Sequence, residues 1–450
     1  MGDADIAGRL PVMLPLSSLA DVLRRAGQSY LGRELDRAKF TLWTEQWYPA
    51  WLVRDRQWER LRELVTHARE ASPFYRERLS RLPASFTFED YARIELLTRA
   101  EVERHAPRIH TGRGGLVRSS GGSGGSGVRI PVDRSAYAWY LAGTWRGLRW
   151  WGGDFTERGV ILLGPGHRGI PGLLTRAKDW VMNWMRLSVD HRFDARVSWL
   201  LRRIRAYEPA FLYAFPSAAH ALARAILEGG EESLSGLKVV VLTGEPLYAF
   251  QRREIQEAFG CPVAREYGSG EVGCLAFECP EGTLHLVSES AYLETLPDPH
   301  LPEGGRILVT SLHNRLFPLL RYEIGDTGTV EEAACPCGRA LPALRVLGRA
   351  QDLLVADGEV RFAHRVLDRL FELLPLPLRG RVRIRQREPS RVAVEAEGGS
   401  DVDLLRVRDL LKDLLGPGWR VEVDRGRIGR LPSGKLAYFV RDGAGTPSHQ

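Results

Sequence analysis

The pattern of apolar and polar positions changes twice along the chain. Over the first hundred residues, apolar side chains recur every three to four positions, with arginine and glutamate between them. This spacing predicts amphipathic helices that cap a larger core. The residues that carry the pattern are Trp58, Leu61, Leu64, Val65 and Ala68.

From about residue 110, short apolar runs alternate with stretches of helical spacing. The runs expected to form buried strands are residues 160–163, 211–213, 239–242 and 307–309. The stretches expected to form helices are residues 195–207, 217–227 and 249–259. Alternating strands and helices predict an α/β domain with largely parallel strand pairing.

A third pattern begins near residue 348. Two runs alternate with period 2, and a helix and a strand are expected to follow them. These four elements are residues 382–385, 392–395, 402–415 and 420–423. Their β-β-α-β order predicts a small α+β domain.

The three patterns divide the chain into a helical N-terminal cap at residues 1–109, an α/β core at 110–347 and a C-terminal α+β domain at 348–450. Five arginines lie between Arg379 and Arg387. Such a run suits nucleic acid, but we interpret it as the solvated face of an alternating edge strand.

Composition narrows the class of protein. The 450-residue chain is 44% hydrophobic, 9% aromatic and 26% charged, with a net charge of +7 from 63 basic and 56 acidic residues. These values are typical of a globular protein and give no reason to expect a nucleic-acid partner. No apolar run approaches the roughly 18 residues of a membrane span, and we expect no signal peptide. Five cysteines make no disulfide framework in a chain this long, which favours the cytoplasm.

A glycine-rich loop is the first candidate binding element. Residues 118–128 read RSSGGSGGSGV and run into an expected strand. Glycine lets backbone amides approach an oxyanion and serine hydroxyls add donors, so the loop suits phosphate. It lacks the lysine of a Walker A loop. A flexible Gly/Ser linker is the alternative interpretation.

Two further segments combine acidic and aromatic residues with glycine. Residues 265–273 read REYGSGEVG, in which Tyr267 offers a ring for a base and Glu271 a carboxylate for magnesium on phosphate. Residues 321–328 read RYEIGDTG, in which Asp326 suits two ribose hydroxyls. The alternative in both cases is a turn with a solvated carboxylate.

The few lysines of the chain make one loop distinctive. Only five are present, and one of them, Lys435, ends the loop LPSGK at residues 431–435. Arg349 follows Gly348 at the expected boundary of the small domain.

Four cysteine and histidine residues are grouped in a way that suits a metal. Cys279 and His285 lie close together in the chain, and Cys335 and Cys337 follow about fifty residues later. Three thiolates and an imidazole predict a closed, tetrahedral structural zinc site, which leaves no open position for catalysis. Unliganded loop cysteines are the alternative.

The order and spacing of these motifs together resemble the adenylate-forming superfamily of acyl-CoA synthetases, luciferases and adenylation domains. The resemblance is closest to the phenylacetate–CoA ligase branch, which includes relatives associated with capsular polysaccharide biosynthesis. It runs from about residue 60 to 440, and His67 through Tyr75 is similar to the branch's N-terminal helix signature. It implies a large adenylate-forming α/β domain with a helical N-terminal cap, and a small, mobile C-terminal α+β domain.

The resemblance also implies site residues. Those expected to bind ATP or AMP are Ser119, Ser120, Gly121, Ser123, Gly124, Gly244, Glu245, Pro246, Tyr267, Gly268, Asp326 and Arg349. Lys435 and Glu271 are expected to be catalytic, with Glu271 acting through Mg²⁺. The chain departs from the family at Gly122, Gly125 and Gly270, where side-chain donors are usual.

The implied reaction is the ATP- and Mg²⁺-dependent activation of a carboxylic acid as acyl-AMP, followed by transfer to CoA. An amide or ester synthetase, with an amine or a sugar as acceptor, is the first alternative. A degenerate scaffold is the second. The three departures to glycine motivate that reading, and the retained Glu271, Asp326, Arg349 and Lys435 oppose it.

The acid itself is the least defined part of the site. Aromatic candidates for its pocket are Tyr137, Tyr213 and Phe215, which suit an aryl or arylalkyl acid similar to phenylacetate. A homodimer is an expectation at the level of the family.

Overall fold

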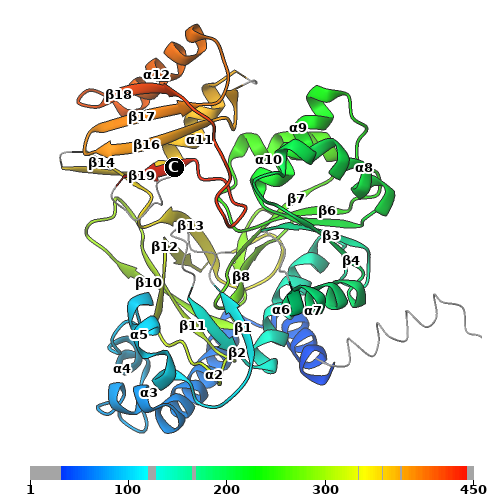
Figure 1. Ribbon diagram of the computed structural model, residues 1–450. Coiled ribbons are helices and arrows are strands. Elements are labelled where there is room, and N and C mark those ends of the chain that lie inside the picture. The colour runs from blue at the N-terminus through cyan, green and yellow to red at the C-terminus, as the bar shows by residue number, and fades with distance from the viewer. Residues whose placement is uncertain are drawn as a thin grey trace, which may run out of the picture.

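The structure, a computed structural model, describes residues 32–119, 128–164, 169–332, 334–356, 358–375 and 378–442. Its N-terminal part is helical, as the periodicity predicts, and lies against one end of a large sheet (Figure 1). The helices are residues 32–45, α2 (Ala50–Ala71), α3 (Pro73–Arg78), α4 (Phe88–Ala92) and α5 (Arg99–Ile109). Thr87 and Thr98 begin α4 and α5 with capping boxes.

A short hairpin flanks the glycine-rich loop. Strands β1 (Leu116–Ser119) and β2 (Arg129–Val132) pair antiparallel, with Ser119 opposite Arg129. Residues 120–127 lie outside the described part of the chain.

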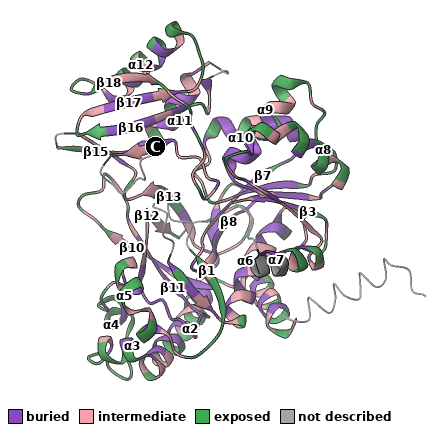
Figure 2. Cartoon of the chain, in the orientation of Figure 1, coloured by how far each residue is buried: buried purple, intermediate pink, exposed green. Residues whose placement is uncertain are grey.

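One half of the large sheet is parallel, as expected. Its strands are β3 (Gly159–Leu163), β4 (Trp184–Ser188), β5 (Phe211–Ala214), β6 (Val239–Leu242) and β7 (Val263–Ser269), in the order β7-β6-β5-β3-β4. The helices of this half are α6 (Arg134–Trp150), α7 (Gly169–Val181), α8 (Val197–Tyr207), α9 (Pro216–Gly229) and α10 (Ala249–Phe259). The strands are buried between two apolar layers, which α6 joins on one face and α8, α9 and α10 on the other (Figure 2).

The other half of the sheet is antiparallel, so the expectation of largely parallel pairing is wrong for it. It continues from β7 in the order β8-β9-β13-β12-β11-β10, which completes eleven strands. The strands are β8 (Gly273–Glu278), β9 (Leu284–Leu286), β10 (Ala291–Pro297), β11 (Gly305–Ser311), β12 (Tyr322–Glu331) and β13 (Ala343–Arg349). The turn from β7 to β8 is too short for the crossover that parallel strands need.

The C-terminal part is a small α+β domain, richer than the predicted β-β-α-β unit. A hairpin of β14 (Leu353–Ala356) and β15 (Glu359–Phe362) leads into α11 (Ala363–Leu373). A four-stranded sheet in the order β18-β17-β16-β19 follows. Its elements are β16 (Val382–Glu388), β17 (Arg391–Ala396), α12 (Asp401–Leu415), β18 (Arg420–Arg425) and β19 (Phe439–Arg441).

The arginine-rich strand is an inner strand, which corrects the expected edge position. Because β19 pairs with β16, the run lies between two neighbours. Its arginines pair with nearby acids: Arg385 lies 2.6 Å from Glu395, and Arg387 lies 2.9 Å from Glu422. These ion pairs account for the basic run within the small domain.

Among the described residues, we find no helix that is both long and apolar enough to span a bilayer.

Candidate active site

A cavity of about 650 Å³ lies where the small domain meets the large one. It is bordered by the ends of β7, β12 and β13 and by the loop that precedes β19. Nine of the residues expected at the site line it. They are Gly244, Glu245, Pro246, Tyr267, Gly268, Glu271, Asp326, Arg349 and Lys435.

The candidate residues of the glycine-rich loop are mostly outside the described structure. Ser120, Gly121, Ser123 and Gly124 fall in the undescribed segment, and Ser119 ends β1. The neighbouring Arg118 donates its Nε–H to the carbonyl of Gly270 at 2.8 Å. The start of the loop is therefore tied to the turn that carries Glu271.

Three residues expected around a nucleoside form a connected chain. The Tyr267 hydroxyl donates to Oδ2 of Asp326 at 2.8 Å, and Nε of Arg349 lies 3.4 Å from Oδ1 of the same carboxylate. Asp326 and Arg349 face each other across β12 and β13, so Asp326 lies in a strand rather than in the expected glycine turn. Burial raises the pKa of Asp326, and Arg349 and Tyr267 oppose that shift.

Glu271 lies in the hairpin turn between β7 and β8, where its side chain is buried. The Tyr322 hydroxyl reaches its Oε1 at 3.5 Å. Gly268 permits this tight hairpin, because a Cβ there would lie 2.4 Å from the carbonyl oxygen of Gly273. A buried carboxylate at the wall of the cavity suits a magnesium ion that is shared with phosphate oxygens.

Lys435 reaches the cavity from the small domain. Its Nζ lies 5.8 Å from the centroid of the Phe215 ring. Burial lowers the pKa of Lys435, and the carboxylates of Glu245, Asp326 and Glu271 act in the opposite direction. Lys435 is thus a partly buried cation whose neighbouring charges include three carboxylates and Arg349.

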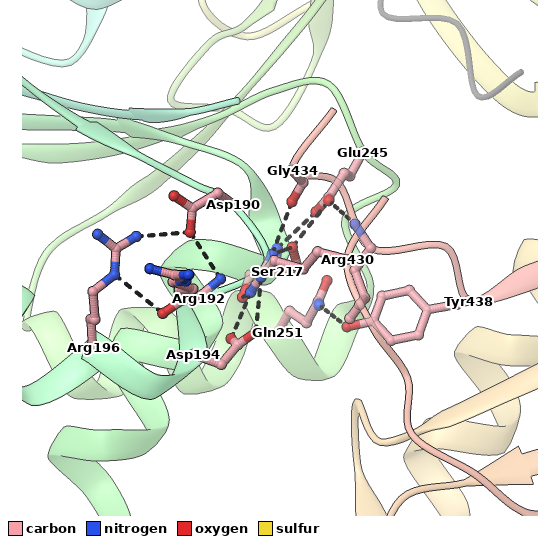
Figure 3. A network of polar contacts seen from close by, with 11 residues as sticks. Asp190, Arg192, Asp194, Arg196, Ser217, Glu245, Gln251, Arg430, Gly434 and Tyr438 are labelled. Carbon is pink, nitrogen blue, oxygen red and sulfur yellow. Dashed lines mark hydrogen bonds and ion pairs between the residues drawn. The ribbon is translucent and has the colours of Figure 1, made fainter. Parts of the chain in front are cut away.

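The segment 430–436, here called the lysine loop, is anchored to the large domain on both sides of Lys435 (Figure 3). On one side, Oε1 of Glu245 accepts the N–H of Leu436 at 2.6 Å. The same carboxylate accepts the amide and the hydroxyl of Ser217, at 2.9 and 3.0 Å. Glu245, which the family resemblance places among the residues expected to bind ATP or AMP, therefore also holds the lysine loop.

On the other side, the anchoring residue is Arg430, which the sequence analysis did not single out. Its guanidinium forms a bidentate ion pair with Asp194, at 3.0 and 2.9 Å, and donates to the Ser217 hydroxyl at 2.8 Å (Figure 3). It also lies 4.8 Å from the centroid of the Phe193 ring. Arginine is common in this chain, so residue type alone does not distinguish Arg430. Its position shortly before Lys435 is the one sequence signal that could have identified it.

Aromatic rings pack across the same boundary. Tyr248 and Phe250, at the start of α10, share one buried cluster with the core of the small domain. The Tyr248 ring lies 5.1 Å from Phe371 and 5.4 Å from Tyr438, and Phe250 lies 4.9 Å from Phe371. The domains therefore meet through an apolar contact as well as the polar one.

The aromatic candidates for an acid pocket are not among the described residues that line the cavity. The Tyr213 hydroxyl donates to Oε1 of Glu266 at 2.7 Å, and Phe215 packs beside Gly244. Tyr137 lies beside the Arg118 guanidinium. Glu266, which the sequence did not single out, does line the cavity, and burial raises its pKa to about 7.

The cysteine cluster comes together away from the cavity. One ligand atom from each of Cys279, His285, Cys335 and Cys337 lies within 4.8 Å of the others. The Sγ atoms of Cys279 and Cys335 are 3.7 Å apart, close to the edge of about 3.8 Å that a tetrahedron with Zn–S bonds of about 2.3 Å requires. His285 points Nε2 at Cys337, while its Nδ1 lies 2.9 Å from the Leu341 carbonyl, which fixes the ring as in zinc sites.

Comparison with known proteins gives sequence relatives but no family-model match. Over 331 residues the chain is 28% identical to phenylacetate-coenzyme A ligase of Thermus thermophilus, which covers 68% of this chain and 72% of the relative. It is 23% identical over 319 residues to protein CapK of Staphylococcus aureus, covering 66% and 68%. A stretch of 99 residues is 40% identical to indoleacetate–lysine synthetase of Pseudomonas savastanoi, covering 21% and 23%.

Solved structures share the fold. The 2-hydroxyisobutyryl-CoA ligase in its postadenylation state with R3-HIB-AMP superposes with a TM-score of 0.71 at 18% identity, covering 89% of this chain and 92% of that one. In its thioesterification state with 2-HIB-AMP and CoA, the same enzyme gives a TM-score of 0.55 at 19% identity, covering 88% and 92%.

The solved structures confirm the predicted fold, a large α/β domain with a small C-terminal α+β domain. In sequence, the chain is similar to phenylacetate-coenzyme A ligase and to CapK, in agreement with the resemblance that its motifs indicate.

Proposed function

We propose that the protein uses ATP to activate a carboxylic acid as acyl-AMP and then transfers the acyl group to CoA. The observation that carries this proposal is the meeting of Tyr267, Asp326, Glu271 and Lys435 around one cavity. They come from two domains and include a cation that the small domain delivers. The aryl or arylalkyl nature of the acid stays a prediction.

In the first half-reaction, a carboxylate oxygen of the acid bonds to the α-phosphorus of ATP. The bond from that phosphorus to the bridging oxygen breaks, and pyrophosphate leaves with the electron pair. The Lys435 ammonium stabilises the charge that develops between the two anions. Asp326 accepts the ribose hydroxyls, and the Tyr267 ring packs on the adenine.

Glu271 is the residue that would hold Mg²⁺, which when bound offsets the charge of the phosphates. Its buried carboxylate at the cavity wall fits that ion. The loop residues Ser119, Ser120, Gly121, Ser123 and Gly124 would hold the β- and γ-phosphates through backbone amides and hydroxyls.

In the second half-reaction, the CoA thiolate attacks the acyl carbonyl and AMP leaves. We propose that residues 348–450 rotate as a domain between the two steps, on a core at 110–347 with its cap at 1–109. Gly348, with φ of +114°, lies at the end of β13 where such a hinge would act. The higher TM-score with the postadenylation state supports the view that the present arrangement is the adenylate-forming one.

Acid-dependent pyrophosphate release tests the proposal. We would screen aryl, fatty and amino acids with ATP and Mg²⁺, with and without CoA. Release that one acid triggers and CoA increases supports a CoA ligase. If folded protein releases no pyrophosphate with any acid of the panel, the result opposes the proposed function.

Lys435→Ala is the matched test of mechanism. We expect it to reduce pyrophosphate release by about 10²- to 10³-fold, as for the loss of one group that stabilises transition-state charge. Lys412→Ala, on the exposed face of α12, is the control and should leave the rate unchanged. Equal rates for Lys435→Ala and the control would remove Lys435 from the mechanism.

An amide synthetase is the second candidate, because a 99-residue stretch is 40% identical to indoleacetate–lysine synthetase. Here an amine nitrogen would attack the acyl carbonyl in place of the thiolate. Acid-dependent release that amines increase and CoA leaves unchanged would favour this candidate.

We also propose that Cys279, His285, Cys335 and Cys337 bind one structural Zn²⁺. The donor set and the 3.7 Å separation of the Cys279 and Cys335 sulfur atoms support this ion.

A further inference from the structure

We propose that Arg430 is a positioning residue for the first half-reaction, which fixes Lys435 in the cavity through its ion pair with Asp194. The inference rests on the proposed function. The inference goes beyond that function because it names the contact that selects the adenylate-forming arrangement of the domains.

Arg430 is held more firmly than a surface arginine. Its side chain is 2% exposed although it belongs to a loop, whereas Asp194 is 57% exposed. The bidentate geometry, with the added bond to Ser217, gives charge-assisted hydrogen bonds in a fixed fork. A desolvated guanidinium that loses its carboxylate is left with neutral acceptors only, so it depends on this contact.

The contact is transmitted to Lys435 within a few residues. The Arg430 guanidinium also donates to the carbonyl of Gly434, at 3.2 Å, directly before the lysine. Within the loop, the N–H of Leu431 binds the Lys435 carbonyl at 2.8 Å. Arg430 thus sets both the place and the shape of the lysine loop.

The loop lies so close to the large domain that a side chain at Gly434 would not fit. Its φ is +85°, and a Cβ there would lie 2.2 Å from the carbonyl oxygen of Val189. Gly164 approaches from the same side, since a Cβ on it would lie 2.9 Å from the Ser433 carbonyl oxygen. Contacts this close form in one orientation of the small domain only.

The acceptor side chains that anchor the loop belong to the large domain. Asp194 lies in the short helix Asp194–Arg196, Ser217 lies in the first turn of α9, and Glu245 follows β6 (Figure 3). Any rotation of the small domain must therefore break the ion pair and the Glu245 contact together. The free energy of these contacts favours the adenylate-forming state over the thioester-forming state.

Asp194→Asn is the decisive variant, because it removes the charge and keeps the shape of a half-exposed residue. Asp190→Asn is the matched control: Asp190 lies nearby, but its partners Arg192 and Arg196 belong to the large domain (Figure 3). Hydrogen–deuterium exchange of peptides spanning 430–436 needs no substrate. We expect about tenfold faster exchange in Asp194→Asn and no change in Asp190→Asn. Unchanged exchange in Asp194→Asn would overturn the proposal.

Kinetics separate positioning from a general structural role. With the acid found by the pyrophosphate screen, Asp194→Asn should reduce ATP–pyrophosphate exchange about tenfold. It should leave unchanged, or raise, the rate of thioester formation from the presynthesised acyl-AMP and CoA. Equal loss in both half-reactions would overturn the positioning role. Hydrogen–deuterium exchange is measured without substrate. It therefore tests the anchoring role of Arg430 even if the proposed function is wrong.

Discussion

Around the cavity, burial acts on the cation and the anions in opposite directions. It lowers the pKa of Lys435 and raises the pKa of Asp326 and of Glu266. Each group is driven toward its neutral form unless an opposite charge lies nearby. The acids around Lys435 are therefore part of what keeps it an ammonium ion.

Glu266 offers a test of this effect that needs no substrate. Burial raises its folded-state pKa to about 7, from the ordinary glutamate value of 4.5. The folded state therefore favours the protonated carboxyl, and that stability is lost as pH rises from about 4.5 through about 7. Glutamine resembles the neutral carboxyl, so we expect Glu266→Gln to unfold at a higher temperature than the wild type at pH 8.

At pH 5 the two proteins should unfold at similar temperatures, as thermal melts at both pH values would show. Glu257→Gln, exposed on α10, serves as the control and should show no such dependence. A Glu266→Gln melting curve that follows the wild type at both pH values would contradict the buried, raised pKa.

Residues that line the cavity were predictable where their motif is local in the chain. Tyr267 and Glu271 share one short motif, and Lys435 is rare by composition. Arg430 was not predictable, because its partners Ser217 and Asp194 lie 213 and 236 positions away. A contact of that kind is set by how two domains meet, which no local pattern contains.

Between elements, the cysteine cluster joins the end of β8 and strand β9 to the loop before β13. Cys279 directly follows β8, and His285 lies in β9. Cys335 and Cys337 lie in the loop before β13. β9 contributes only three residues to the sheet and pairs with β13 through a single pair of positions, Ala343 and His285. A metal ion at this point would fix a weak part of the sheet.

We expect the purified protein to contain one zinc ion per chain by elemental analysis. Cys337→Ser should lose the metal and unfold at a lower temperature, because a structural zinc site contributes directly to folding free energy. Cys261→Ala is the control, since Cys261 is a buried cysteine outside the cluster and should keep full zinc content. A metal-free wild type with unchanged stability would leave the cysteines as unliganded loop residues.

The helices and buried strands of the core were predictable from the spacing of apolar residues alone. The match of residues 249–259 with α10 is an example. Strand direction was not, since parallel and antiparallel strands can carry the same buried run. The run at 307–309 became an antiparallel strand, β11, because hairpin-like connections replace helices in that half.

For the whole molecule, the shared aromatic cluster makes the two domains one cooperative unit. Tyr248 and Phe250 of the large domain complete the core of the small one. Without them, Phe371 and Tyr438 would be open to water on one side. The small domain is therefore not expected to be fully stable alone.

Phe250→Ala tests this coupling by calorimetry. We expect one endotherm for the wild type. In the variant we expect a loss of about 3–5 kcal/mol, as for a buried phenylalanine, with the endotherm splitting as the domains uncouple. Phe88→Ala, at a half-exposed ring on α4, should leave a single endotherm. Two endotherms already present in the wild type would contradict a shared core.

The aromatic contact also makes the proposed rotation of the small domain dependent on temperature. Rotating the small domain away from α10 would return the rings of Tyr248 and Phe250 to water, at least in part. Apolar attraction weakens on cooling, whereas the ion pair of Arg430 does not share that dependence. On cooling, the aromatic contact between the domains therefore weakens, and the Arg430 ion pair becomes the main contact that positions Lys435.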